Sequence, residues 1–333
     1  FFMELLHTPS DIFSDSLVYL RIYILGLFFL FLYNICNGIF NALGDSRTPL
    51  YLLIGSSIVN VVLDIVFIVY CGWGVAGVAW ATLIAQGLSG VLAFLLLWKR
   101  VGLGKVEEKF SFAMLKVIGK MAIPSILQQS FISVGNFLVQ SVVNGYGFSV
   151  IAGYSAAVRL NTFAITCFTT LGNSLSGYVA QNFGAGNVTR IKKGYKATLF
   201  LMIFVVVFFT GSYLLFSENL IGLFLKNGSE AAIKAGNTFL RVVSPFFFFI
   251  CLKLVTDGVL RGTGAMKPFM ISTFTDLILR VILAFSMGTE TSIINQQFAL
   301  KETGIWLSWP LGWIVAAILA LCFYKKGVWK KGN

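Results

Sequence analysis

The chain has 333 residues, of which 57% are hydrophobic and 11% are charged, and its mean hydropathy is +0.86. Soluble domains carry about 25% charged residues, so this composition excludes a soluble domain with one membrane anchor and indicates a polytopic helical membrane protein. The net charge of +12 would suggest a nucleic-acid partner in a soluble protein. Here the basic residues fall in short loops, so the charge reports membrane topology and no nucleic-acid partner is expected.

The reactive side chains of the chain are few and scattered. The 5 cysteines contain no C-x-x-C pair, and His7 is the single histidine. A metal site or a disulfide framework needs cysteines or histidines at short spacings, and a membrane-embedded enzyme would need a cluster of His, Cys or acidic residues. The sequence therefore predicts a protein that is not an enzyme and has neither a resident metal nor a cofactor.

Nine apolar segments are long enough to cross a bilayer, and they follow a short helix end and a polar turn within residues 1–16. Pro124, Pro245 and Pro310 fall inside predicted spans, where proline removes a backbone hydrogen bond and kinks the helix. The longest polar connection, 100–115, separates a partial N-terminal lobe (1–99) from a C-terminal lobe (116–333). The predicted spans are 17–42, 48–70, 75–99, 116–143, 149–182, 194–222, 234–262, 267–289 and 305–325.

The basic residues indicate the orientation of these spans. If the 100–115 loop is cytoplasmic and the spans alternate, most of the 25 basic residues lie on the cytoplasmic side, including those of the tail 325–331. The opposite side receives only Lys226, Lys234 and Lys301. Lysine and arginine are enriched in cytoplasmic loops of membrane proteins, so the sequence predicts a multi-pass protein of the inner (plasma) membrane with a cytoplasmic C-terminus.

Two parts of the chain repeat each other. The first predicted span matches the seventh in Tyr19-Leu20-Arg21-Ile22 against Phe239-Leu240-Arg241-Val242, and Gly44 matches Gly264. The two copies are six spans apart, so they face the same way in the membrane, as in the parallel repeats of some transporters. Three spans precede the seventh span within the C-terminal lobe. By symmetry, three spans should also precede the first span in the N-terminal lobe. We therefore expect an all-α protein with a 6+6 repeat whose first three helices are absent from this chain.

Several motifs resemble one transporter family. They are Gly44-Asp45-Ser46-Arg47-Thr48-Pro49, Asn60-Val-Val-Leu-Asp64, Gly74-Val-Ala-Gly77, Val179 to Gly186, and Leu260-Arg261-Gly262-Thr263-Gly264. In order and spacing they resemble helices 4 to 12 of multidrug and toxic compound extrusion (MATE) transporters, over nearly the whole chain. The resemblance implies a monomeric secondary antiporter that exports small organic cations or drugs across the lipid bilayer in exchange for protons or sodium.

The candidate coupling site lies in the N-terminal lobe. Asn60 and Asp64 are four residues apart, so they share one helix face, and an ionisable group in an apolar helix is by default a functional hypothesis. In one branch of the family that the chain resembles, the cation site uses an aspartate on helix 1, which is among the helices expected to be absent from this chain, an asparagine on helix 4, an Asn/Asp pair on helix 5 and a threonine on helix 6. The resemblance thus implies Asn37, Asn60, Asp64 and Thr82, with a proton or sodium ion at Asp64.

Other intramembrane polar residues are candidates of lower rank. Asn34 shares a helix face with Asn37, and Gln86 shares one with Thr82, although small polar residues in bilayers also serve simply as interhelical hydrogen-bonding groups. Two charged pairs have i, i+4 spacing, and each pair either neutralises itself structurally or lines a cavity of the C-terminal lobe. These pairs are Lys253 with Asp257 and Asp276 with Arg280. Arg159 has no oppositely charged neighbour in sequence, so it either snorkels or faces that cavity.

The main competing function is a flippase for a lipid-linked precursor, as in related families of the same superfold. A flippase would be expected to have a strongly cationic central cavity. The intramembrane charges here are of both signs, which favours the antiporter.

Overall fold

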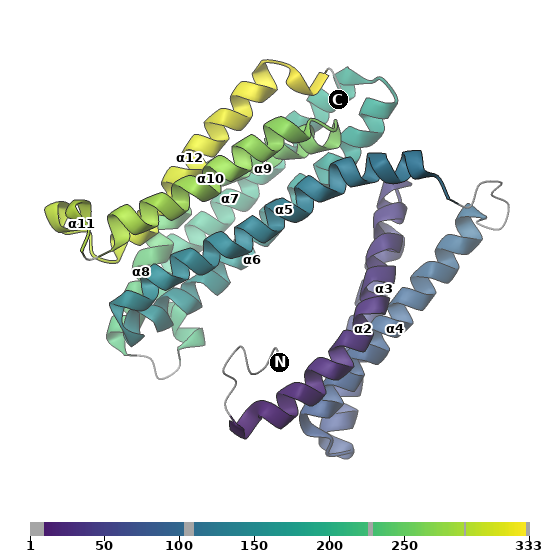
Figure 1. Ribbon diagram of the computed structural model, residues 1–333, viewed down its shortest axis with the longest axis horizontal. Coiled ribbons are helices and arrows are strands. Elements are labelled where there is room, and N and C mark those ends of the chain that lie inside the picture. Colours follow the sequence, from purple (N-terminus) through teal and green to yellow (C-terminus); the bar gives the residue numbers. More distant parts are fainter. Residues whose placement is uncertain (1–9, 103–109, 226–228, 290, 331–333) are drawn as a thin grey trace. The chain divides into compact units, whose positions relative to one another are not determined.

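The computed structural model of the protein describes residues 10–102, 110–225, 229–289 and 291–330, and every regular element in these ranges is helical. Contacts between residues divide the chain into two compact units, Phe1–Phe110 (unit 1) and Ser111–Asn333 (unit 2). The division falls inside the polar connection predicted at 100–115. Figure 1 shows the helices of the two units, and each unit has its own hydrophobic core.

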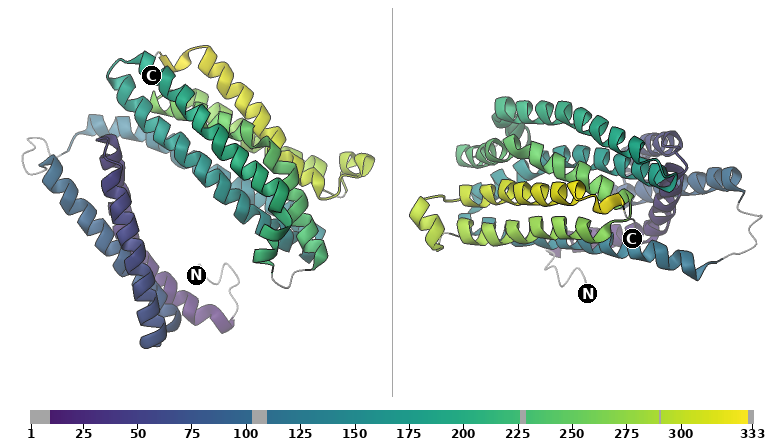
Figure 2. Two further views of the ribbon diagram at one scale, coloured as in Figure 1. Left: turned by 180° about the vertical axis from the view of Figure 1, so that it is seen from behind. Right: turned by 90° about the horizontal axis from the view of Figure 1, so that it is seen from above.

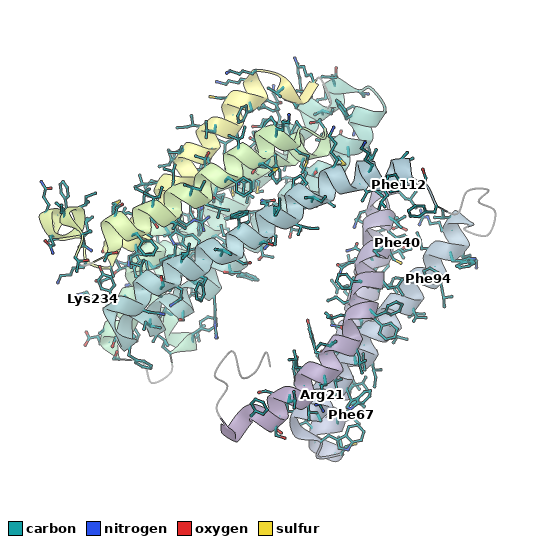
Figure 3. All side chains as sticks on the ribbon, in the orientation of Figure 1. Arg21, Phe40, Phe67, Phe94, Phe112 and Lys234 are labelled. Carbon is teal, nitrogen blue, oxygen red and sulfur yellow. The ribbon has the colours of Figure 1, made fainter. Side chains whose placement is uncertain are left out.

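Unit 1 contains three long helices, which are α2 (Ser10–Ala42), α3 (Arg47–Ile65) and α4 (Gly74–Val101). α3 continues as a π-helical segment, Val66–Tyr70. α2 and α4 lie side by side because small residues let them approach: a Cβ atom added to Gly90 would lie 2.8 Å from the backbone oxygen of Phe29. Phe40 packs in a small core at one end of this pair, with Phe94 against it (Figure 3).

The turn between α2 and α3 is built by Asp45. Its Oδ1 accepts hydrogen bonds from the backbone N–H groups of Arg47 and Thr48, both at 3.1 Å, and its Oδ2 accepts one from the Thr48 hydroxyl at 2.7 Å. Oδ2 also forms an ion pair with Arg100 at the end of α4. The bonds from Thr48, followed by the positive charge of Arg100, hold the pKa of Asp45 below its usual value. The Gly-Asp-Ser-Arg-Thr-Pro motif is therefore a helix-start turn that also ties α4 to α3.

Unit 2 is a helical bundle. Its elements are α5 (Phe112–Val143), α6 (Phe148–Gly184), α7 (Val188–Phe224), α8 (Glu230–Val243), α9 (Phe247–Gly262), α10 (Met266–Gly288), α11 (Ile293–Phe298) and α12 (Thr303–Lys325). Its long helices run alongside one another (Figure 2). Its core is rich in aromatic residues, and Phe239, Phe247 and Trp306 are fully buried in it.

The prediction of membrane-spanning helices is confirmed: the described part of the chain contains 9 helical segments long and apolar enough to cross a bilayer. Most predicted bounds agree with the observed ones to within a few residues, but two helices begin earlier than predicted. α7 begins at Val188 instead of 194, and α2 begins at Ser10, inside the polar turn predicted at residues 8–11. That turn's Thr8 and Pro9 lie outside the described residues. The six-residue α11 belongs to no predicted span, since it is too short to give an apolar segment.

The three prolines within spans behave differently. Pro124 and Pro310 lie inside the continuous helices α5 and α12, whereas Pro245 lies in a 3₁₀ turn, Ser244–Phe246, that separates α8 from α9 within the seventh span. Helix interruptions in a membrane need a neighbour that satisfies the freed backbone groups. Here the Thr210 hydroxyl of α7 donates to the backbone oxygen of Ser244 at 2.9 Å, so the break is supported by the adjacent helix.

Close contact between α10 and α12 depends on Gly304. A Cβ atom there would lie 1.9 Å from the backbone oxygen of Met287, which cannot move without displacing its helix. We expect Gly304→Ala to destabilise the protein by roughly 1–3 kcal/mol through overpacking, seen as a lower melting temperature in detergent. The matched control is Gly211→Ala in α7, where no atom lies within 4 Å of the added Cβ. Equal melting temperatures for the two variants would contradict this account of the helix contact.

Candidate functional site

Unit 1 contains a cavity of about 380 Å³ that is lined from all three helices. Four of the predicted site residues line it: Asn34 from α2, Asn60 from α3, and Thr82 and Gln86 from α4. The lining contains four further polar residues outside the predicted coupling site: Tyr33, Ser56, Ser57 and Ser89. Ser57 lies three residues before Asn60 and Ser89 three residues after Gln86, so the helical periodicity of the polar residues could have identified these two.

The side chains of this cavity present mostly hydrogen-bond acceptors. The amide nitrogen of Asn34 and the hydroxyls of Ser56, Thr82 and Ser89 each donate to a backbone oxygen three or four residues earlier in their own helix, at 2.8 to 3.0 Å. Each donation leaves the side-chain oxygen with lone pairs directed elsewhere. A wall of acceptor oxygens in an apolar bundle suits a metal cation, or a ligand that carries N–H donors.

Asp64 lies one turn beyond Asn60 on α3. It is half-buried and is not among the residues that line the cavity. Asp64 Oδ1 and Asn60 Nδ2 are buried and have no hydrogen-bond partner among the described residues. An unsatisfied acceptor and an unsatisfied donor at one place in an apolar helix are costly, so this turn of α3 is suited to receive a ligand.

Asn37 is separate from the other predicted residues. It is half-buried, does not line the cavity, and its Oδ1 accepts a hydrogen bond from Asn41 Nδ2 at 2.7 Å. The structure therefore brings Asn34, Asn60, Thr82 and Gln86 together at one cavity and leaves Asn37 and Asp64 outside its lining.

Unit 2 has a larger cavity, of about 570 Å³, lined by α5, α6, α9, α10 and α12. Both intramembrane charge pairs line it. Lys253 Nζ lies 2.9 Å from Asp257 Oδ2, and Arg280 Nη2 lies 3.2 Å from Asp276 Oδ2. Each pair therefore forms an ion pair along one helix and is also part of the cavity wall.

Neighbouring helices add hydrogen bonds to the buried pairs. Asp257 Oδ1 accepts from the Ser272 hydroxyl at 3.0 Å, and Lys253 Nζ donates to Thr273 Oγ1 at 3.2 Å. The guanidinium carbon of Arg280 lies 4.6 Å from the ring centroid of Trp309, within the range of a cation–π interaction. These contacts explain how the charges are held in an apolar bundle.

The polar face of α6 in this cavity was not predicted from the sequence. Thr162, Thr166, Thr170 and Asn173 recur at helical spacing along one side of α6 and line the cavity. That spacing is readable in the sequence and could have indicated them. Arg159, on the same helix, is exposed and is not among the lining residues.

Comparisons with known proteins agree with this architecture. The MatE family model matches residues 1–66 and 124–286. The probable multidrug resistance protein YpnP of Bacillus subtilis is 28% identical over 329 residues, which cover 98% of this chain and 72% of the relative. The probable multidrug resistance protein YoeA of the same organism is 24% identical over 340 residues, covering 99% of this chain and 71% of the relative.

A solved structure has the same fold. It is an outward-facing multidrug resistance MATE family transporter of the MOP superfamily, with a TM-score of 0.88 at 21% sequence identity, and the match covers 99% of this chain and 73% of that chain. The family model covers more than half of the chain, and α4 and α12, which also line the cavities, lie outside the matched ranges. This chain therefore belongs to the MATE family of multidrug efflux transporters, which are multi-pass membrane transporters and not enzymes.

Proposed function

We propose that the protein is a secondary antiporter that exports organic, cationic, drug-like compounds across the cytoplasmic membrane in exchange for protons or sodium. The observation that carries the proposal is the cavity of unit 1, whose polar residues present acceptor oxygens beside Asn60 and Asp64. The names of the relatives, which are multidrug resistance proteins, support export as the direction of transport.

Coupling in this proposal depends on one negative charge. A proton or sodium ion at Asp64 neutralises the carboxylate, so the apolar helices can close around it. Asn60 and Thr82 supply oxygen atoms that orient the bound ion, and Asn34 and Gln86 line the same cavity. Asn37, which was predicted with them, lies outside this lining and has no role in the proposed ion binding. A cationic compound favours the ionised carboxylate and expels the ion. Exchange follows because ion and compound compete for the same charge, and no other cofactor is required.

The proposed orientation places the 100–115 connection and the C-terminus in the cytoplasm. It is supported by the basic residues of that side, which exceed those of the opposite side (Lys226, Lys234, Lys301). We propose that the protein functions as a monomer in the inner membrane of the cell.

The test is dye export by the full-length protein. Expression in an efflux-deficient host is expected to lower the accumulation of ethidium, and an imposed proton or sodium gradient is expected to drive ethidium transport in proteoliposomes. The gradient that drives transport identifies the coupling ion. If dye accumulation stayed unchanged for several organic cations despite verified membrane expression, the antiporter proposal would fail and flipping of a lipid-linked precursor would become the better account.

A further inference from the structure

The segment after α12 folds back onto the start of α7. The chain turns at Gly327, whose φ is 68°, and residues Val328–Lys330 form a 3₁₀ turn. Trp329 is 1% exposed and stacks on Tyr324 with ring centroids 5.5 Å apart, and its indole N–H donates to the backbone oxygen of Tyr324 at 3.0 Å. Tyr324 stacks in turn on Tyr195 of α7, with ring centroids 4.4 Å apart. These three rings, the aromatic stack, hold the segment 325–330 beside the first turns of α7.

The aromatic stack is fixed to the interior of the bundle through Tyr195. The Tyr195 hydroxyl lies 3.0 Å from Oγ1 of Thr256, a fully buried residue of α9. Thr256 uses its own proton to donate to the backbone oxygen of Leu252 at 2.7 Å, so Tyr195 is the donor in the bond between the two hydroxyls. The position of the segment 325–330 is therefore set by packing between three helices.

The aromatic stack brings two basic segments together. Seven exposed cationic side chains, the basic patch, lie on them: Arg190, Lys192, Lys193 and Lys196 of α7, and Lys325, Lys326 and Lys330. In the described part of the chain none of the seven forms an ion pair. The sequence has no aspartate or glutamate between 111 and 217 or after Glu302, so neighbours along the chain supply no counter-charge.

The position of these charges is unfavourable for α7 itself. A helix N-terminus carries a partial positive charge, so acidic residues stabilise it and basic residues do not. The first turn of α7 has no acidic residue. Lys192 and Lys196 repel each other, because like charges four residues apart face each other on a helix. An anion bound from outside the chain would offset both effects.

We propose that the basic patch binds the headgroups of anionic phospholipids, such as phosphatidylglycerol, at the membrane surface. The patch lies where the apolar parts of α7 and α12 end, which is the depth of the lipid phosphates. Tyrosine and tryptophan are enriched at this depth in membrane proteins, as in the aromatic stack. Clusters of roughly 4–8 lysines and arginines beside a membrane helix bind anionic headgroups. In the orientation proposed above, these lipids belong to the cytoplasmic leaflet.

A simpler role for the same residues is to set the orientation of the helices. That role depends on how many positive charges lie on one side of the membrane. It does not depend on whether the segment 325–330 is held against α7, whereas lipid binding by the assembled patch does. Two kinds of variant therefore separate the roles. One kind removes equal charge inside or outside the patch, and the other releases the segment without changing any charge.

The experiment measures lipid binding to the full-length protein purified in detergent. The protein is titrated with phosphatidylglycerol or with phosphatidylcholine of the same acyl chains, and native mass spectrometry gives the apparent dissociation constants. We expect the unaltered protein to prefer phosphatidylglycerol. The triple variant Lys192→Gln, Lys196→Gln and Lys330→Gln is expected to weaken phosphatidylglycerol binding about 10-fold or more, because each lysine near an anionic headgroup contributes to binding. Binding of phosphatidylcholine should not change.

Two further variants complete the design. The matched control is the triple variant Lys116→Gln, Lys120→Gln and Lys267→Gln, which removes the same charge from exposed positions outside the patch and should bind phosphatidylglycerol like the unaltered protein. Trp329→Ala releases the segment and keeps every charge, and we expect it to weaken phosphatidylglycerol binding several-fold. Its melting temperature and its elution in size-exclusion chromatography establish that the bundle is intact. If Trp329→Ala did not fold, the two triple variants would still decide the proposal.

Equal weakening by the two triple variants would overturn the proposal, because binding would then follow total charge alone. Equal affinity of the unaltered protein for the two lipids would overturn it as well, and so would unchanged binding by a folded Trp329→Ala. Displacement of phosphatidylglycerol by an equal concentration of inorganic phosphate would overturn it by making the patch a site for soluble anions. The proposal does not depend on export, since lipid preference is measured without transport.

Discussion

Asp64→Asn is expected to abolish ion-driven export while leaving the amount of protein in the membrane near that of the unaltered protein. The exchange keeps the shape of the side chain and removes its charge. Asp64 Oδ1 is buried without a hydrogen-bond partner among the described residues, so no described polar contact of this oxygen is lost. Without the carboxylate, a proton or sodium ion has no charge to neutralise, and the compound and the ion no longer compete.

The measurement is dye transport in proteoliposomes under an imposed proton or sodium gradient. Asp15→Asn is the matched control, because it makes the same chemical change at an exposed position near the start of α2 and should transport at the unaltered rate. If Asp64→Asn retained some dye transport whose rate did not depend on either the proton or the sodium gradient, this result would support the role of Asp64 in coupling. Transport at the unaltered rate with the same ion dependence would place the coupling site elsewhere.

Asp276→Asn is expected to destabilise unit 2 strongly. Arg280 is 6% exposed and Asp276 is its ion-pair partner at 3.2 Å. Removing the carboxylate leaves a buried guanidinium without its counter-charge, which costs about 3–5 kcal/mol in proteins. The Arg280 contact with Trp309 and its 3.4 Å hydrogen bond to Asn136 Oδ1 remain, but neither supplies a negative charge.

This effect is measured as the melting temperature in detergent, which is determined by size-exclusion chromatography of heated samples. The informative control is the double variant Asp276→Leu with Arg280→Met, because replacing both members of a buried pair by apolar residues is often neutral or stabilising. We expect the double variant to melt above Asp276→Asn. If Asp276→Asn melted at the same temperature as the unaltered protein, Arg280 would not need Asp276 as its counter-charge. The proposed structural role of the pair would then be contradicted.

The membrane spans and the start of α3 could be predicted from the sequence. A helix that crosses a bilayer must satisfy its backbone hydrogen bonds internally and be apolar over a length set by the membrane, so composition along the chain is enough to find it. The turn at Asp45 is equally local, because Asp45 bonds to residues two and three positions ahead and Gly44 adopts a φ of 79°. Interactions within a few residues are readable without knowing the fold.

The sequence also indicated polar residues of both cavities, but it did not determine which of these residues line the same cavity. Asn34 and Asn37 were placed on one helix face, yet only Asn34 lines the unit 1 cavity. Arg159 was predicted either to snorkel or to face the cavity of the C-terminal lobe, and it is exposed and does not line that cavity.

These outcomes depend on the tertiary structure, and the reason is geometric. The direction of a side chain depends on how its helix is rotated against its neighbours, and that rotation is set by contacts far apart in sequence, such as Gly304 against Met287. The break at Pro245 follows the same rule, because the partner of the Ser244 oxygen is Thr210 on another helix. Local sequence determined where the helices are, and packing between distant residues determined what each cavity presents to a ligand.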